Sequence, residues 1–229
     1  MNEIGNLYIV ATPIGNLEDI TFRAVRILKE VDCILCEDTR TTKKLLDRYD
    51  IHTNTMSYNA HSTDSKSSLI IKMLREGKNL ALVSDAGTPC ISDPGVLLVS
   101  DVRKEFSVDA KVIPIPGPSA LVSALSASGV SSANFTFLGF LPHKKGRETL
   151  FKEIASSKEV IVFYESTHRI LKTLESLDQH TPNFKVVIAR ELTKEFEQYV
   201  DGTPSEVLKY FSDHKDKQRG EFVVIVVPR

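Results

Sequence analysis

Several features that would assign this chain to a common class of protein are absent from its sequence. Three cysteines among 229 residues are too few for a disulfide framework, which fits a reducing compartment. No apolar run approaches the roughly 20 residues that a membrane-spanning helix needs. The first residues form neither the basic nor the apolar stretch of an export signal. The sequence therefore predicts a soluble, cytoplasmic protein that does not enter a membrane.

The sequence also lacks an excess of charge of either sign. It has 29 Lys and Arg against 30 Asp and Glu, and both signs are balanced before and after Pro116. Because neither half is a basic arm, we expect any nucleic-acid site to be a local patch. Hydrophobic residues make up 41% and charged residues 26%, which indicates a globular chain long enough for one large domain or two small ones.

The fingerprints of the most common nucleotide and hydrolase sites are missing. There is no G-x-G-x-x-G after the first predicted strand, no G-x-x-x-x-G-K-[ST] and no G-x-S-x-G, which disfavours a dinucleotide fold, a P-loop and an α/β-hydrolase. Cys33 and Cys36 form a C-x-x-C, but no second pair follows and they lie on a predicted strand, facing opposite sides. We therefore expect buried strand cysteines and no metal site.

Short apolar runs alternate with segments of helical period along the whole chain. This alternation predicts an α/β protein whose sheets are covered on both faces. The Pro116-Gly117-Pro118 segment forbids regular structure and predicts two α/β domains, residues 1–116 and 117–229. Strands are expected at 7–11, 33–36, 80–83, 111–115, 134–139, 159–164, 184–190 and 221–227, and helices at 20–30, 40–49, 66–76, 96–106, 119–129, 147–156, 168–177 and 204–212.

Three loops rich in small residues and proline follow predicted strands of the first half: 11–16, 84–95 and 114–120. Ligands of an open α/β sheet bind at the carboxyl ends of its strands, and small residues allow the backbone to approach a ligand closely. Each loop alone could be a turn whose aspartates cap a helix. Three of them together favour a site for an adenosine-like or small organic ligand.

Ionisable residues gather at other predicted strand ends. Glu37, Asp38 and Arg40 follow one strand, where they have either a functional role or the role of a helix cap beside a solvated face. His61, after another strand, is ambiguous in the same way.

Three further segments of this kind lie in the second half of the chain. Residues 139–147 combine an aromatic side chain with Lys144 and Lys145, which suits RNA phosphates and a stacking surface, although a solvated loop has the same composition. Residues 163–169 and 189–194 form either internal ion pairs or the lining of a polar cleft.

In order along nearly the whole chain, these segments resemble the bacterial ribosomal RNA small-subunit 2′-O-ribose (cytidine) methyltransferases I, within the tetrapyrrole methylase (class III) superfamily. The first loop lacks the G-x-G-P-G form common in porphyrin methylases, which favours the RNA branch. The matching segments are 5–17, 36–40, 84–89, 92–95, 116–120, 139–142, 164–166, 168–169, 189–194 and 220–221.

The resemblance implies a fold, a reaction and a donor site. It implies two α/β/α domains with S-adenosylmethionine in the cleft between them, usually in a homodimer. The family methylates a cytidine ribose in the decoding region of 16S rRNA, in the small ribosomal subunit. Many members continue past the last predicted strand; RNA contacts made by such a tail are either absent from this protein or made by residues beyond the given sequence. The implied donor-binding residues are Pro13, Gly15, Asp85, Ala86, Gly87, Thr88, Pro89, Ser92, Asp93, Ser119 and Ala120.

The reaction would join a ribose oxygen to an activated methyl group. A ribose hydroxyl is a weak acid, so a nearby base or orienting group should help; the candidates are Glu37, Asp38 and His61, which the sequence does not rank. Two other functions stay open: methylation of a tetrapyrrole or another small molecule on the same fold, and non-catalytic RNA binding. The residues expected to hold RNA phosphates are Arg40, Lys144, Lys145 and Arg169.

Overall fold

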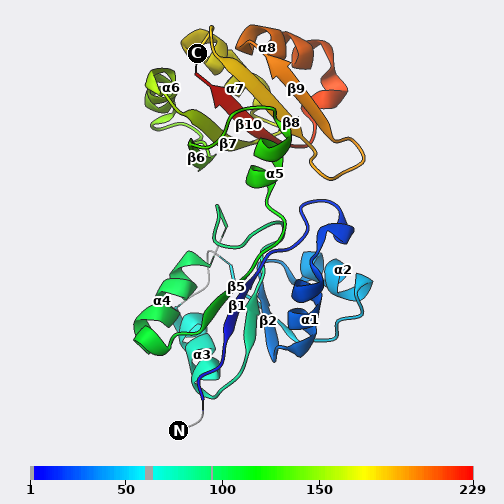
Figure 1. The fold of residues 1–229 in the computed structure, drawn as a ribbon, viewed down its shortest axis with the longest axis vertical. Coiled ribbons are helices and arrows are strands. Elements are labelled where there is room, and N and C mark those ends of the chain that lie inside the picture. The colour runs from blue at the N-terminus through cyan, green and yellow to red at the C-terminus, as the bar shows by residue number, and fades with distance from the viewer. Residues whose placement is uncertain (1–2, 60–63, 94, 229) are drawn as a thin grey trace. The chain divides into compact units, whose positions relative to one another are not determined.

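The computed structural model describes residues 3–59, 64–93 and 95–228 (Figure 1). The chain divides into two compact units, Met1–Ser119 and Ala120–Arg229. Each unit has its own five-stranded sheet. The division falls at Ser119, just after the Pro116-Gly117-Pro118 segment, rather than at Pro116 itself.

The sheet of the first unit is parallel throughout, in the order β3-β2-β4-β1-β5. Parallel strands need crossover connections, which here are helices. All five carboxyl ends therefore lie at one edge of the sheet. The strands are β1 (Leu7–Val10), β2 (Cys33–Cys36), β3 (Thr55–Ser57), β4 (Leu80–Leu82) and β5 (Val112–Ile115), and the helices are α1 (Phe22–Glu30), α2 (Thr39–Arg48), α3 (Asp64–Arg75) and α4 (Val96–Phe106).

Helices cover both faces of this sheet, with α1 and α2 on one side and α3 and α4 on the other (Figure 1). Side chains alternate along each strand, so β2 sends Cys36 into the core under α1 and α2 and Cys33 into the core under α3 and α4. The prediction that the two cysteines face opposite sides is confirmed. A side-chain cap begins α1, where the hydroxyl of Thr21 accepts a hydrogen bond from the Ala24 amide at 3.1 Å.

The sheet of the second unit is mixed, in the order β6-β7-β10-β8-β9. Only β6 and β7 are parallel among its described pairs; the other neighbours are antiparallel. The central strand β10 is a buried apolar run with core on both faces. The strands are β6 (Phe135–Phe140), β7 (Val160–Ser166), β8 (Lys185–Arg190), β9 (Gln198–Gly202) and β10 (Glu221–Val227), and the helices are α5 (Ala120–Ala127), α6 (Arg147–Ser156), α7 (Ile170–His180) and α8 (Pro204–Asp213).

Strand β9 is absent from the predicted elements. Its sequence, Gln-Tyr-Val-Asp-Gly, is half exposed because the strand lies at the edge of the sheet. Pairing with β8 and an ion pair between Lys185 and Asp201, at 2.7 Å, hold it in place. No helix of the described residues has both the length and the apolar composition to cross a membrane.

Candidate functional site

The three loops that the sequence singles out are joined at the carboxyl edge of the first sheet. The loop after β1 meets the loop after β4 through two backbone hydrogen bonds: the Thr12 amide donates to the Gly87 carbonyl at 2.9 Å, and the Gly87 amide donates to the Thr12 carbonyl at 3.0 Å. The Thr12 hydroxyl, which is buried, donates to the Ser84 carbonyl at 3.1 Å. Thr12 is therefore the residue that ties the first two loops together, although the site prediction does not include it.

The loop after β5 joins the same group. The Thr88 hydroxyl donates to the Pro118 carbonyl at 3.0 Å. A Cβ atom on Gly117 would come within 3.0 Å of the Ala11 side chain, and Gly87 has a φ of +84°. These two positions need glycine because the loops pack too closely, or turn too sharply, for a side chain.

The predicted donor-binding residues share this group of loops but differ in exposure. Two non-glycine residues near its end, Cys90 and Ser92, have left-handed backbone with φ of 69° and 65°, a conformation that costs free energy and is common at functional sites. Pro13, Gly87 and Pro89 are buried, Thr88, Asp93, Ser119 and Ala120 are half-buried, and Gly15, Asp85, Ala86 and Ser92 are exposed.

Acidic side chains line one side of these loops. The Asp38 amide donates to a carboxylate oxygen of Asp85 at 3.1 Å. Burial raises the pKa of Asp93 to about 6, helped by the negative charge of Glu37. The pKa of Glu37 is also raised, first by burial and then by the charge of Asp85. Asp85 therefore disfavours the ionisation of Glu37, and Glu37 disfavours that of Asp93.

Asp38 differs from its neighbours because it is paired. Its carboxylate accepts hydrogen bonds from the Arg40 guanidinium, at 2.6 Å to Nη2, and from the Arg40 amide at 2.8 Å. These contacts lower the pKa of Asp38 to about 2, so it remains an anion that caps α2. The helix-cap alternative is therefore observed for Asp38, whereas a functional role of Glu37 stays a prediction. His61 lies outside the described residues.

Arg40 also borders a surface hollow of about 330 Å³ next to α2 and β3. Lys43, Asp47 and His52 contribute to its wall, so the hollow carries side chains of both signs. Among the described residues, no group of three or more His, Cys, Asp and Glu side chains is arranged to hold a metal ion.

In the second unit, a buried carboxylate organises the basic segment 139–147. Glu165, at the end of β7, has a fully buried side chain. Its Oε1 lies 2.7 Å from Nε of Arg169, and its Oε2 accepts a hydrogen bond from the Thr173 hydroxyl at 2.7 Å. The same hydroxyl accepts a hydrogen bond from Nη2 of Arg147 at 2.6 Å. Burial lowers the pKa of Arg147 more than the nearby charge of Glu165 raises it.

The two arginines hold the loop between β6 and α6. Nη1 of Arg169 donates to the Leu141 carbonyl at 2.8 Å, and Nη1 of Arg147 donates to the Pro142 carbonyl at 3.3 Å. The guanidinium of Arg169 is therefore bound within the protein, and its side chain is only 15% exposed. Lys144 and Lys145, in contrast, are exposed at the tip of this loop.

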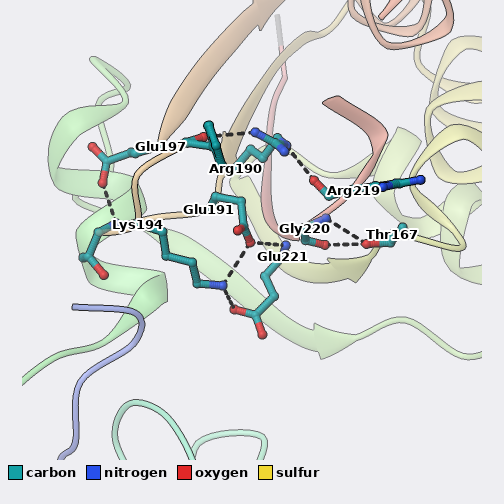
Figure 2. A network of polar contacts seen from close by, with 10 residues as sticks. Thr167, Arg190, Glu191, Lys194, Glu197, Arg219, Gly220 and Glu221 are labelled. Atoms are coloured by element: carbon teal, nitrogen blue, oxygen red, sulfur yellow. Dashed lines mark hydrogen bonds and ion pairs between the residues drawn. The ribbon is translucent and has the colours of Figure 1, made fainter. Parts of the chain in front are cut away.

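A second polar network occupies the segment after β8 (Figure 2). Glu191, with a φ of 50°, accepts hydrogen bonds from Lys194 and from the Glu221 amide, both at 2.9 Å. Although burial raises the pKa of Glu191, these two hydrogen bonds lower it overall. A Cβ atom on Gly220 would come within 2.6 Å of the Glu191 side chain. The carboxylate therefore packs directly against glycine backbone.

Arg190 extends the same network (Figure 2). It is buried, and it donates to the Arg219 carbonyl at 2.7 Å and to the Phe196 carbonyl at 3.0 Å. The ionisable groups of 189–194 thus satisfy one another and nearby carbonyls. Of the two interpretations left open for this segment, internal ion pairing is the one observed.

Known proteins resemble this chain over nearly its whole length. Residues 6–208 match the family model of Tetrapyrrole (Corrin/Porphyrin) Methylases. The "Ribosomal RNA small subunit methyltransferase I" of Halalkalibacterium halodurans is 49% identical over 97% of this chain and 75% of the relative. The protein of the same name from Bacillus subtilis is 44% identical over 98% of this chain and 76% of the relative. This chain belongs to the ribosomal RNA small subunit methyltransferase I family.

Solved structures support the fold of this methyltransferase family member. Diphthine synthase superposes with a TM-score of 0.74 at 13% identity, covering 98% of this chain and 90% of that chain. The methyltransferase CobJ has a TM-score of 0.71 at 17% identity, covering 98% and 94%. The predicted tetrapyrrole-methylase-like α/β fold is confirmed, as is the family that the motifs indicate.

Proposed function

We propose that this family member transfers a methyl group from S-adenosylmethionine to the 2′-hydroxyl of a cytidine in the decoding region of 16S rRNA. The observation that carries the proposal is the joining of three loops at one sheet edge by Thr12, Gly87 and Thr88. Its relatives at 44–49% identity are named for small-subunit ribosomal RNA, which supports RNA as the acceptor. We further propose, from the family resemblance, a cytoplasmic homodimer that acts on the small ribosomal subunit.

The residues of the joined loops fit an adenosine-like donor. Gly117 packs closely against Ala11, and Gly87 has a left-handed backbone that other residues rarely adopt. Without side chains at these positions, backbone groups can approach a planar ligand closely. One related fold, uroporphyrin-III C-methyltransferase from Thermus thermophilus, has been solved with S-adenosylhomocysteine, at a TM-score of 0.65 and 17% identity, covering 97% of each chain. When bound, S-adenosylmethionine would supply a methyl group activated by a positively charged sulfur.

The acidic cluster suits such a cation. Burial raises the pKa of Glu37, helped by the charge of Asp85, and burial raises the pKa of Asp93, helped by the charge of Glu37. A positive charge beside these carboxylates would relieve that repulsion. The site would hold the donor through the predicted residues of the loops, with Ser119 and Ala120 at the end of the third loop. Alignment of the two reactants can contribute roughly 7–11 kcal/mol to catalysis.

Among the candidate bases, Glu37 is the one we favour. A general base works best when its pKa approaches the pH of the reaction. The pKa of Glu37 is raised, whereas that of Asp38 is lowered to about 2. Glu37 would accept the proton of the ribose hydroxyl, and Asp38 would hold Arg40 in place.

The RNA backbone would lie along exposed basic side chains. Arg40, Lys144 and Lys145 are exposed, and each can pair with a phosphate. Arg169 would act through the loop that it holds rather than by contacting phosphate, because its guanidinium already binds Glu165 and the Leu141 carbonyl.

A second candidate function is methylation of a tetrapyrrole on the same fold, which the family model and the solved structures favour. Transfer of tritium from labelled S-adenosylmethionine distinguishes the two. The purified protein is incubated in parallel with small ribosomal subunits from a strain that lacks this modification and with uroporphyrinogen III. Label in the 16S rRNA alone supports the RNA substrate, and label in the tetrapyrrole alone contradicts it. Donor-independent RNA binding without label in either would indicate a non-catalytic module.

A further inference from the structure

An exposed aromatic ring stands at the end of β6. Phe140 is 56% exposed, and its ring lies 5.5 Å from that of Tyr164 in an edge-to-face arrangement. Tyr164 contacts Phe137 in the same way at 5.0 Å. Phe140 is therefore supported by a partner along one side while more than half of its surface meets solvent.

The backbone before Phe140 sets this orientation. The register between β6 and β7 shifts between Phe137 and Phe140, and Gly139 has a φ of 62°. An irregularity of this type re-aims the side chain that follows it, and such bulges are frequent next to active sites. Phe140 is thus placed by a local distortion of β6.

The basic loop follows directly after this ring. Lys144 and Lys145 are exposed, and among the described residues neither forms an ion pair. The ends of the loop are fixed: Leu141 and Arg147 are both buried. Two positive charges that lack a carboxylate partner therefore lie within five residues of an exposed ring.

The loop is held by the buried carboxylate of Glu165. Arg169 forms an ion pair with this carboxylate and donates a hydrogen bond to the Leu141 carbonyl. Arg147 donates hydrogen bonds to the Thr173 hydroxyl and to the Pro142 carbonyl. A loop ordered in advance loses little conformational entropy when a ligand binds. Its fixed ends make the segment 140–146 a preformed surface.

We propose that Phe140 is the stacking platform for one unpaired base of the RNA substrate, with Lys144 and Lys145 binding the adjacent phosphates. Single-stranded RNA is recognised by this combination of aromatic faces and cations, because every base offers a flat face and every nucleotide a negative charge. The choice of RNA rests on the proposed function, whereas the surface itself rests on the contacts described above.

The test is the affinity for a fluorescein-labelled single-stranded RNA oligonucleotide of the decoding-region sequence, measured by anisotropy at several salt concentrations. Phe140→Leu removes the ring and should weaken binding about tenfold at every salt concentration. Phe140→Tyr retains the ring and should bind within about twofold of the unmodified protein. Phe196→Leu is the matched control, since Phe196 is 60% exposed in the same unit but far along the chain; it should leave the affinity unchanged.

Salt dependence separates stacking from charge. Phe140→Leu should leave the slope of log affinity against log salt unchanged, whereas Lys144→Ala with Lys145→Ala should make it shallower by about 1.4. The proposal is overturned if Phe140→Leu binds within twofold of the unmodified protein, or if Phe196→Leu weakens binding as much. Methyl transfer by the unmodified protein keeps the two ideas apart. Transfer to RNA without a Phe140 effect removes only the platform, and a Phe140 effect without transfer removes only the proposed function.

Discussion

Nε of Arg169 lies 2.7 Å from Oε1 of Glu165, a carboxylate with no solvent exposure. The sequence leaves two roles open for residues 163–169, internal ion pairs or the lining of a polar cleft. The contact shows that the motif builds the protein's interior. Through the hydrogen bond from Arg169 to the Leu141 carbonyl, it also holds one end of the exposed loop that bears Lys144 and Lys145.

Replacing Glu165 by glutamine should destabilise the protein strongly. The change removes the negative charge that balances Arg147 and Arg169, and leaving buried charges without their partner costs about 3–5 kcal/mol. Urea denaturation followed by circular dichroism measures the loss in the free energy of unfolding. Glu153→Gln, on the exposed side of α6, is the control and should change stability by less than about 0.5 kcal/mol. Equal stability of the two variants would refute the role given to Glu165.

Gly87→Ala should weaken donor binding beyond its effect on stability. Gly87 has a φ of +84° and its added Cβ would lie 3.4 Å from the Ile14 side chain, next to the bridge with Thr12. Gly129 has a φ of +67° with nothing within 4 Å of such an atom. Both alanine variants should lose about 1–2 kcal/mol of stability to backbone strain.

Only Gly87→Ala should lower the affinity for S-adenosylmethionine, by about tenfold, as measured by isothermal titration calorimetry. Gly129→Ala provides the comparison at similar backbone strain. Matching donor affinities in the two variants would mean that the joined loops do not bind the donor.

Asp93 should give the unfolding free energy an unusual pH dependence. Its pKa is raised from 3.8 to about 6 in the folded protein, chiefly by burial. Between these two pH values the folded state binds more protons than the unfolded state, so the contribution of Asp93 to stability falls as pH rises and is constant above about pH 6. Below pH 3.8 the carboxyl is protonated in both states and contributes no difference.

Asp93→Asn removes the ionisation that lowers the free energy of unfolding as pH rises. The stability of the variant relative to the unmodified protein should therefore increase from about pH 4 to about pH 6 in urea titrations. Glu37→Gln removes the second cause of the shift, so in that background the increase should be smaller and should end at a lower pH. A flat difference across this range would show that Asp93 is not shielded from solvent as described.

Glu37→Gln and Asp38→Asn should differ in turnover. Loss of a general base lowers kcat by roughly 10²-fold or more, so we expect this of Glu37→Gln. Asn is as good a helix cap as Asp, and Asp38 already has too low a pKa to accept a proton. We therefore expect kcat of Asp38→Asn to stay within a few fold. Single-turnover rates provide the measurement, and the opposite order would assign the base to Asp38.

Much of the fold follows from local sequence patterns. Buried parallel strands such as Cys33–Cys36 are continuous apolar runs bounded by turn residues, and this pattern predicts them correctly. Edge strand β9 has no such run, because its stability comes from pairing with β8 and not from its own composition.

The site is only partly predictable for a related reason. Loops 11–16, 84–95 and 114–120 are visible in the sequence because glycine and proline mark them. The bridge between Thr12 and Gly87 joins residues 75 positions apart, and the ranking of Glu37 over Asp38 depends on burial and on the contact with Arg40. Such long-range contacts are set by the packing of helices on the sheet and leave no local signal.

Methyl transfer to the natural form of the substrate tests the central claim most directly. Small ribosomal subunits from a strain that lacks the modification are incubated with the protein and S-adenosylmethionine, and the nucleosides of the digested 16S rRNA are read by mass spectrometry. We predict a new 2′-O-methylcytidine from the decoding region. The Glu37→Gln variant should form it at least about 10²-fold more slowly. A methyl group that appears on a base, or no methylation of RNA despite measurable donor binding, would contradict the proposed reaction.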